Sequence, residues 1–312
     1  MANLDEITGS PLRLKGRGVD RRFFLAALAA QLGPRAPARP ETRGHPVMPA
    51  CGVTGYRPAL EYTFGTTGNV RSLADLRAHF THDAPWGRIN GELQSFQPFN
   101  ARNYAFETDC LALTGLADGS GVYNAWGHIT SGALISRATC FAPCVVEIVA
   151  KLPAGRAVWP SLYLADVHSG KNDSSEIDIM ESQYNAPIGR RDDRSFVYQF
   201  DHGPGVGADE SSKMDRWGRW QPYGPMPGGD MSARWAAYSA LWLPDRITKY
   251  VDNKAGVTRM FKWTGPAEPN ILIYNSIGSD KVDWPGPVSA GTFAGDNAKF
   301  RIKSIRVFKP KG

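Results

Sequence analysis

The chain has 312 residues, of which 42% are apolar, and it contains 33 glycines and 23 prolines. This composition suits one large all-β domain, because β-sandwiches often exceed the usual domain length, and no low-complexity tract interrupts it. The formal net charge is +6, and residues 1–38 carry half of it through six basic and three acidic side chains. The charge that remains is too small to indicate the clustered basic face of a nucleic-acid-binding protein.

The amino terminus has the features of an export signal. Asp20-Arg21-Arg22-Phe23-Phe24-Leu25 resembles a twin-arginine motif, and an apolar stretch follows directly at residues 23–32. This stretch is too short to cross a bilayer as a helix, so we expect no stable membrane span. Ala36-Pro37-Ala38 has the small-residue pattern of a cleavage site, although a buried amphipathic helix is the alternative interpretation. We expect a signal peptide at 1–38, a linker arm at 39–59, a catalytic domain at 60–312, and export to the periplasm or the extracellular space.

Beyond the leader, the pattern is that of short strands. Apolar and β-branched runs recur between clusters of glycine, proline, asparagine and aspartate, which is typical of an all-β domain. One helical pattern occurs, at residues 73–80. The predicted strands include residues 110–113, 145–150, 196–200, 246–251 and 271–274.

Four cysteines are too few for a disulfide scaffold. Cys140 and Cys144 flank Phe-Ala-Pro, which could turn tightly enough to close a small loop, whereas in an extended strand they would lie about 13 Å apart. A twin-arginine substrate folds in the reducing cytosol, which favours free thiols at Cys51, Cys110, Cys140 and Cys144.

An acidic segment stands out at Ser175-Glu176-Ile177-Asp178-Ile179-Met180-Glu181. Side chains alternate along a strand, so Glu176 and Asp178 would share one face while Glu181 would be out of phase. One extra residue around Ile179-Met180, a β-bulge, would return Glu181 to the acidic face. Read as a helix, residues 176 and 181 would lie about 140° apart and could not form a common site.

Two glutamates that face one cleft indicate glycoside hydrolysis. A retaining enzyme needs a nucleophile and an acid/base about 5 Å apart across the sugar bond. An intervening carboxyl group, Asp178, would hydrogen-bond Glu176 and help to keep the two pKa values apart. The alternative is an acidic strand edge that deters aggregation.

The segment Glu176–Glu181 resembles the signature of glycoside hydrolase family 16 in its bulged form, as found in laminarinase-like, agarase-like and carrageenase-like members. Other parts of the chain resemble segments of that family in the family's order, over roughly residues 60 to 310. These segments are Asn90-Gly91-Glu92-Leu93-Gln94, Thr130-Ser131-Gly132, residues 146–153, Trp159-Pro160-Ser161-Leu162-Tyr163, residues 238–242, 247–252 and 275–278, Trp284-Pro285-Gly286, and residues 300–308.

The resemblance implies a concanavalin-like jelly-roll β-sandwich with a substrate cleft on its concave sheet. It assigns Glu176 as the nucleophile, Glu181 as the acid/base and Asp178 as their support. Flat aromatic rings stack on the apolar faces of sugars, so we expect Trp159 and Trp284 in the cleft, and Trp126 and Trp242 in the core. Further expected substrate-binding residues are Asn90, Glu92, Tyr163, His202, and Trp217 and Trp220 of the long segment 203–234.

Three positions depart from the family pattern. Ala133 and Tyr163 stand where many members have arginine and tryptophan, and Lys303 stands near the place of a calcium-binding aspartate. The lysine argues against the structural calcium that many members bind without excluding it, and the resemblance implies no cofactor. The sequence predicts a monomeric, exported, retaining endo-β-glycosidase whose partner is a polysaccharide of the β-1,3-glucan or galactan type. A transglycosylase or an exopolysaccharide-trimming glycanase is one alternative, and a non-catalytic carbohydrate-binding sandwich is another.

Overall fold

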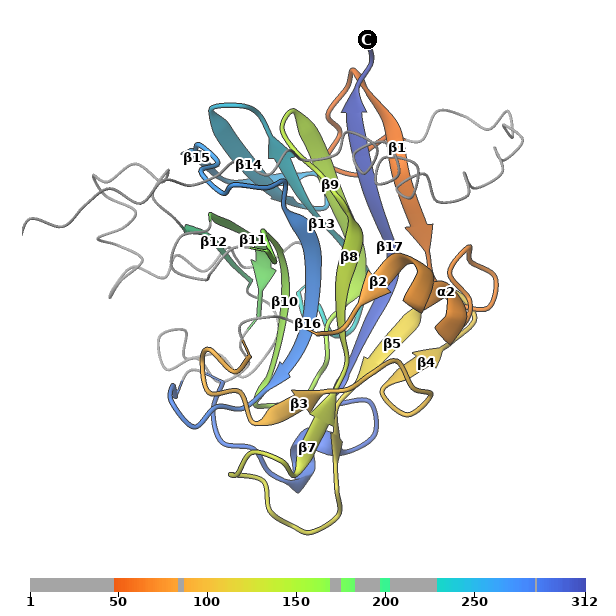
Figure 1. Ribbon diagram of the computed structural model, residues 1–312, viewed down its shortest axis with the longest axis vertical. Helices are drawn as coiled ribbons and strands as arrows, with labels where there is room; N and C mark the ends of the chain where they lie inside the picture. Colours follow the sequence, from red (N-terminus) through yellow and green to blue (C-terminus); the bar gives the residue numbers. More distant parts are fainter. Residues whose placement is uncertain (1–47, 84–86, 169–174, 183–196, 203–228, 284) are drawn as a thin grey trace, which may run out of the picture. The chain divides into compact units, whose positions relative to one another are not determined.

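The computed structural model describes residues 48–83, 87–168, 175–182, 197–202, 229–283 and 285–312. Nearly all of the regular structure in these ranges is β-strand, as the sequence predicts (Figure 1). The expected signal peptide and residues 39–47 of the expected linker arm lie outside the described residues. No helix in the described ranges is long and apolar enough to cross a membrane.

The larger sheet has eight strands, and its neighbouring strands are antiparallel. Its long central strands, β9 and β17, pair along most of their length (Figure 1). The strand order is β15 (Lys254–Met260), β14 (Arg246–Val251), β13 (Ala236–Trp242), β9 (Cys144–Lys151), β17 (Lys299–Pro310), β5 (Leu111–Thr114) and β4 (Tyr104–Phe106), with β1 (Tyr56–Thr63) also paired with β17.

The second sheet has six antiparallel strands and carries the acidic segment near one edge. Its order is β12 (Tyr198–His202), β11 (Glu176–Glu181), β10 (Val158–Ala165), β16 (Asn270–Ile277), β8 (Ala133–Thr139) and β2 (Phe80–Thr81). A small third sheet contains β3 (Gln94–Phe96), β7 (Ile129–Ser131) and β6 (Leu116–Ala117). The remaining elements are the helix α2 (Leu73–His79) and the short 3₁₀ helix η1 (Ala290–Phe293).

The main core lies between the two large sheets. Leu162, Ile177 and Ile273 of the six-stranded sheet belong to the same buried cluster as Val146 and Tyr238 of the eight-stranded sheet. Burial of this continuous apolar layer removes it from water and supplies the main driving force for the sandwich. A β-sandwich is therefore the fold of this chain, in agreement with the sequence prediction.

Trp242 lies in this core, as expected, and is 1% exposed. Its ring packs edge-on against Phe141 and Phe261, with centroid distances of 5.0 and 6.5 Å. The helix predicted at residues 73–80 is also present, because the Ser72 hydroxyl caps it by accepting the Asp75 N–H at 3.1 Å.

The outer face of the eight-stranded sheet is covered in part by residues that precede β1. Cys51 packs there against Val145 and Phe308. The buried Glu147 carboxylate fixes this segment by accepting the Ala50 N–H at 2.5 Å. Residues 48–59, which were expected to belong to the linker arm, therefore form part of the folded domain. All four cysteines are buried and carry free thiols.

Candidate active site

The bulge predicted in the acidic segment is present in β11. Between Asp178 and Glu181, two residues of β11 oppose a single residue of β12, Gln199. The register with β10 shifts at the same point. The buried Gln199 amide donates to the carbonyl of Ile179 at 3.2 Å, and this contact satisfies a backbone acceptor at the bulge. Ile179 is thus the residue by which β11 exceeds its neighbours in length.

The bulge changes the direction in which the last carboxylate points. Ile177, Ile179 and Met180 all belong to the core between the sheets, so two consecutive residues face inward at the bulge. Across the strand pair, Glu176, Asp178 and Glu181 lie opposite Ala165, Tyr163 and Ser161 of β10. These three β10 residues line a cleft on the outer face of the six-stranded sheet. All three carboxylates are therefore on the cleft face.

Glu176 and Glu181 both line this cleft, which has a volume of about 270 Å³. Asp178 lies between them in the chain and is 2% exposed. The indole N–H of Trp159 donates to Oε1 of Glu181 at 3.1 Å, and Trp159 itself lines the cleft. This hydrogen bond fixes the position of one carboxylate oxygen while the other side of the carboxyl group stays in the cleft.

Tyr163 of β10 and Tyr274 of β16 lie beside one another on the cleft face, with ring centroids 5.2 Å apart in an edge-on arrangement. Burial raises the pKa of the Tyr163 phenol well above its usual range, and the neighbouring Tyr274 and Glu176 raise it further. Burial likewise raises the pKa of Tyr274. Both phenols are therefore protonated and uncharged near neutral pH.

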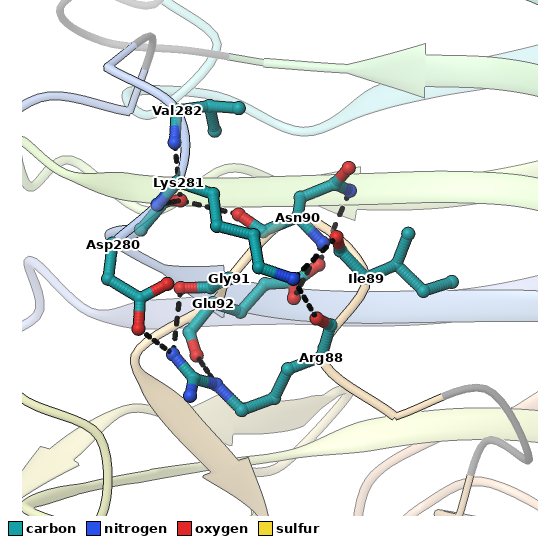
Figure 2. Close-up of polar contacts among 9 residues, drawn as sticks. Arg88, Ile89, Asn90, Gly91, Glu92, Asp280, Lys281 and Val282 are labelled. Carbon is teal, nitrogen blue, oxygen red and sulfur yellow. Dashed lines mark hydrogen bonds and ion pairs between the residues drawn. The ribbon is translucent and has the colours of Figure 1, made fainter.

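Asn90 and Glu92 also line the cleft, on the segment that leads into β3. The Glu92 carboxylate accepts the backbone N–H of Asn90 at 3.2 Å and its side-chain amide at 3.3 Å. A second segment, residues 279–282, holds this one in place (Figure 2). Gly91 makes the close approach feasible, because its φ is +70° and a Cβ would lie 2.2 Å from Oδ1 of Asp280.

Six of the predicted site residues thus lie at one cleft: Glu176, Glu181, Trp159, Tyr163, Asn90 and Glu92. Asp178 joins them through its place on β11. His202 is in β12, opposite Glu176, but its side chain lies outside the described part of the structure. Trp217, Trp220 and Trp284 also lie outside the described residues.

The prediction for Trp126 was wrong, because this side chain is in the cleft lining and is 53% exposed. The guanidinium of Arg88 lies over its ring, 5.5 Å from the centroid. Sequence reasoning also missed Arg88 itself, His82 and Asp83, which line the same cleft. One signal was available for Trp126: it stands in a polar loop next to Gly127 and not within an apolar run.

The place at which the resemblance would put a calcium ligand holds Lys303. Its ammonium group is 2.7 Å from Oδ2 of Asp109 and lies over the ring of Trp235, 5.5 Å from the centroid. A protonated amine cannot coordinate a cation, so these residues do not fit a calcium ion. Within the described ranges, no group of three or more metal-ligating side chains occurs.

The fold and the cleft define a jelly-roll type of β-sandwich with paired carboxylates on one sheet face. No family model matches the chain, and no curated protein does. Solved structures do match. The endo-β-1,3-glucanase of Pyrococcus furiosus is 20% identical, with a TM-score of 0.59, over 82% of this chain and 95% of that one. The laminarinase catalytic domain of Thermotoga maritima MSB8 is 24% identical, with a TM-score of 0.58, over 82% and 99% of the two chains.

A third structure is SCLam, a non-specific endo-β-1,3(4)-glucanase from family GH16. It is 20% identical to this chain, with a TM-score of 0.61, over 86% of this chain and 95% of its own. Each alignment covers nearly the whole of the solved domain, so the likeness extends through both sheets. These similarities confirm the predicted fold.

Proposed function

We propose that this protein is a retaining endo-β-glycosidase of the glycoside hydrolase family 16 type, acting on a neutral β-1,3-linked or mixed-linkage glucan. The observation that carries the proposal is the bulge at Ile179, which brings Glu176 and Glu181 to the same cleft. A plain strand of this sequence would place them on opposite faces and could not support two-carboxylate chemistry.

In this mechanism Glu176 attacks the anomeric carbon and forms a covalent glycosyl-enzyme intermediate. Glu181 protonates the leaving oxygen and then deprotonates the water that releases the sugar. Trp159 orients Glu181 through the indole N–H contact at 3.1 Å. Asp178, buried between the two glutamates along the strand, supports Glu176 electrostatically. The reaction needs two carboxylates and water, and no cofactor.

The charges of the described cleft lining favour a neutral substrate. Four carboxylates line it, those of Asp83, Glu92, Glu176 and Glu181, and the only permanently charged cation among the described lining residues is Arg88. Arg88 is itself paired with Asp280 at 2.6 Å. A sulfated galactan would bring dense negative charge into this acidic surrounding, and like charges at close range cost binding free energy. A glucan has no such cost, and the solved structures named above are glucanases.

The test is a panel of polysaccharides assayed for new reducing ends, with laminarin and mixed-linkage β-glucan set against carrageenan and agarose. We expect activity on the glucans, loss of nearly all of it in Glu176→Gln, and normal activity in the matched control Glu268→Gln, an exposed carboxylate outside the cleft lining. Wild-type turnover by Glu176→Gln would refute the assignment. Proton NMR of the first product should show the β-anomer, and a first-formed α-anomer would exclude retention.

We also propose export, which rests on the twin-arginine-like sequence. Replacing Arg21 and Arg22 by lysine keeps the charge but removes the paired guanidinium groups that the export receptor would read. The unprocessed precursor should then accumulate in the cytoplasm, as followed by cell fractionation and immunoblotting. Undiminished export of the double variant would contradict the twin-arginine route.

A further inference from the structure

Arg88 is fixed by three acceptors at the rim of the cleft (Figure 2). Its Nη2 donates to Oδ2 of Asp280 at 2.6 Å and to the carbonyl of Gly91 at 3.0 Å. Its Nε donates to the carbonyl of Glu92. A planar guanidinium with donors in fixed directions suits three acceptors from two chain segments, whereas a lysine could not satisfy the same set. We call these contacts the Arg88 clasp.

Lys281 strengthens the clasp from the other side. Its ammonium group lies 3.5 Å from the carbonyls of Arg88 and Ile89, and the Asp280 N–H donates to the Gly91 carbonyl at 2.9 Å. The segment that carries Arg88 is therefore bound through main-chain and side-chain contacts along its length. Such a clasp holds the guanidinium in one place, because several independent contacts would have to break before it could move.

Trp126 lies against this fixed cation. The ring is 53% exposed and lines the cleft, with the guanidinium carbon of Arg88 over it at 5.5 Å from the centroid. The loop that presents Trp126 is itself held, since Tyr123 stacks on Phe293 with centroids 5.9 Å apart. The ring is therefore held on one face by Arg88, while more than half of its surface stays open at the cleft.

We propose that Trp126 is a stacking platform for a pyranose ring of the glycan chain, and that Arg88 is the positioning residue that holds the platform. The proposal rests on the proposed function and deepens it by naming a specificity-determining subsite. The guanidinium occupies one face of the indole, so a sugar ring can stack only on the other. The apolar C–H face of a neutral β-linked pyranose matches that surface.

The same residues could be taken for an anion site, since Arg88 is cationic. The structure argues against this, because the Asp280 carboxylate already neutralises the guanidinium and because Asp83 and Glu92 add negative charge to the same lining. A sulfate or a uronate would have to displace Asp280 from a 2.6 Å contact. The Arg88 clasp therefore orients the platform, and it does not recognise charge.

The experiment compares kcat and KM on a short and a long laminari-oligosaccharide for Trp126→Ala, Trp126→Phe and Arg88→Lys. The matched control is Met260→Ala, which truncates an exposed large apolar side chain that lies outside the cleft lining. Trp126→Ala should raise KM for the long substrate by roughly three- to tenfold, the range that one aromatic stacking contact provides. The loss should fall on KM and not on kcat, as expected when uniform binding is removed.

Trp126→Phe should recover part of the affinity, because a smaller flat ring remains. Arg88→Lys should raise KM in the same direction, and the double variant Arg88→Lys/Trp126→Ala should fall short of the product of the single effects, since one residue acts through the other. A KM for Trp126→Ala equal to that of Met260→Ala would overturn the platform while leaving the proposed function intact.

Failure of the proposed function would look different, because the wild-type protein would then cleave no β-glucan at all. In that case the platform is tested by binding alone. Isothermal titration calorimetry measures the affinity of the same long oligosaccharide for the Glu176→Gln protein, with and without Trp126→Ala. Equal affinity in Glu176→Gln with and without Trp126→Ala, or no binding at all, would overturn it.

Discussion

A buried ion pair behind β11 allows a sharp test of the sandwich. Lys249 of β14 lies 2.9 Å from Asp201 of β12, and each side chain is 2% exposed. Asp201 is opposite Ile177 of β11 in the six-stranded sheet, so the pair joins the two sheets directly behind the acidic segment. Arg259 is a more distant neighbour, 3.9 Å from the same carboxylate.

The perturbation is Lys249→Met, which keeps the length of the side chain and removes its charge. Leaving one member of a buried pair uncompensated costs about 3–5 kcal/mol. Because Arg259 remains near Asp201, we expect the lower end, about 3 kcal/mol. For a domain of this size such a loss lowers Tm by roughly 6–12 °C.

The pH dependence follows from Asp201. Burial raises the pKa of its carboxyl group, and Lys249 opposes that effect. A group whose folded-state pKa is raised stabilises the protein while it is protonated, and this contribution is lost as the pH rises through that pKa. In Lys249→Met the destabilisation should therefore be larger at pH 7 than at pH 5, where the isolated carboxyl group can take up a proton.

The assay is urea unfolding at both pH values, followed by tryptophan fluorescence. The matched control is the double variant Lys249→Met/Asp201→Leu, which removes both charges and should recover most of the lost stability. A loss below about 1 kcal/mol in Lys249→Met, or a loss that does not change with pH, would refute the reasoning that this pair is shielded from water.

Three further outcomes are expected. Arg301→Ala should lower the free energy of unfolding by about 1–2 kcal/mol at pH 7, because Arg301 lies 2.8 Å from Glu107 and lowers the pKa of that carboxyl group. In urea titrations the loss should shrink as the pH falls through the lowered pKa, and a constant loss would argue against the pair. Gly91→Ala should destabilise by about 1–3 kcal/mol and raise KM, since φ is +70° and the Cβ meets Asp280; an unchanged Tm and KM would show that the segment can move aside. Thiol titration of the unfolded protein purified under reducing conditions should find four free thiols, and a count of two would reveal a disulfide.

Local pattern was enough to predict the strand that carries the acidic residues. The run Glu176–Glu181 combines carboxylates with apolar residues, and only a bulged strand brings its two glutamates to one face. The sequence alone therefore places the bulge near Ile179 and Met180, where the structure has it. Local pattern also predicted the strands near residues 145–150 and 246–251 and the capped helix at Leu73–His79. Each depends on side chains only a few positions apart.

The rim of the cleft could not be predicted in this way. Arg88 and Asp280 are 192 residues apart in the chain, and their contact depends on how two loops are placed by different sheets. The exposure of Trp126 depends on the same loops, since composition alone allows a tryptophan to lie in the core or in the cleft. The pairing of Lys249 with Asp201 likewise requires knowledge of which strands face one another across the sandwich.

The bulge in β11 keeps the two glutamates of the proposed mechanism on one face, although the strand carries one residue more than regular alternation allows. The side chains on either side of Ile179 are tied to fixed places, Ile177 and Met180 to the core and Glu181 to the cleft, while the Gln199 amide is bonded to the carbonyl of Ile179 itself. A conservative substitution at Ile179 changes only how well the core is filled. Deleting residue 179 would remove the bulge and the Gln199 contact, and the remaining Glu-Ile-Asp-Met-Glu would alternate regularly, with Met180 still toward the core and Glu181 still toward the cleft. The bulge and the residue count together set the phase of the strand, so a change in one keeps Glu181 on the cleft face only when the other changes with it.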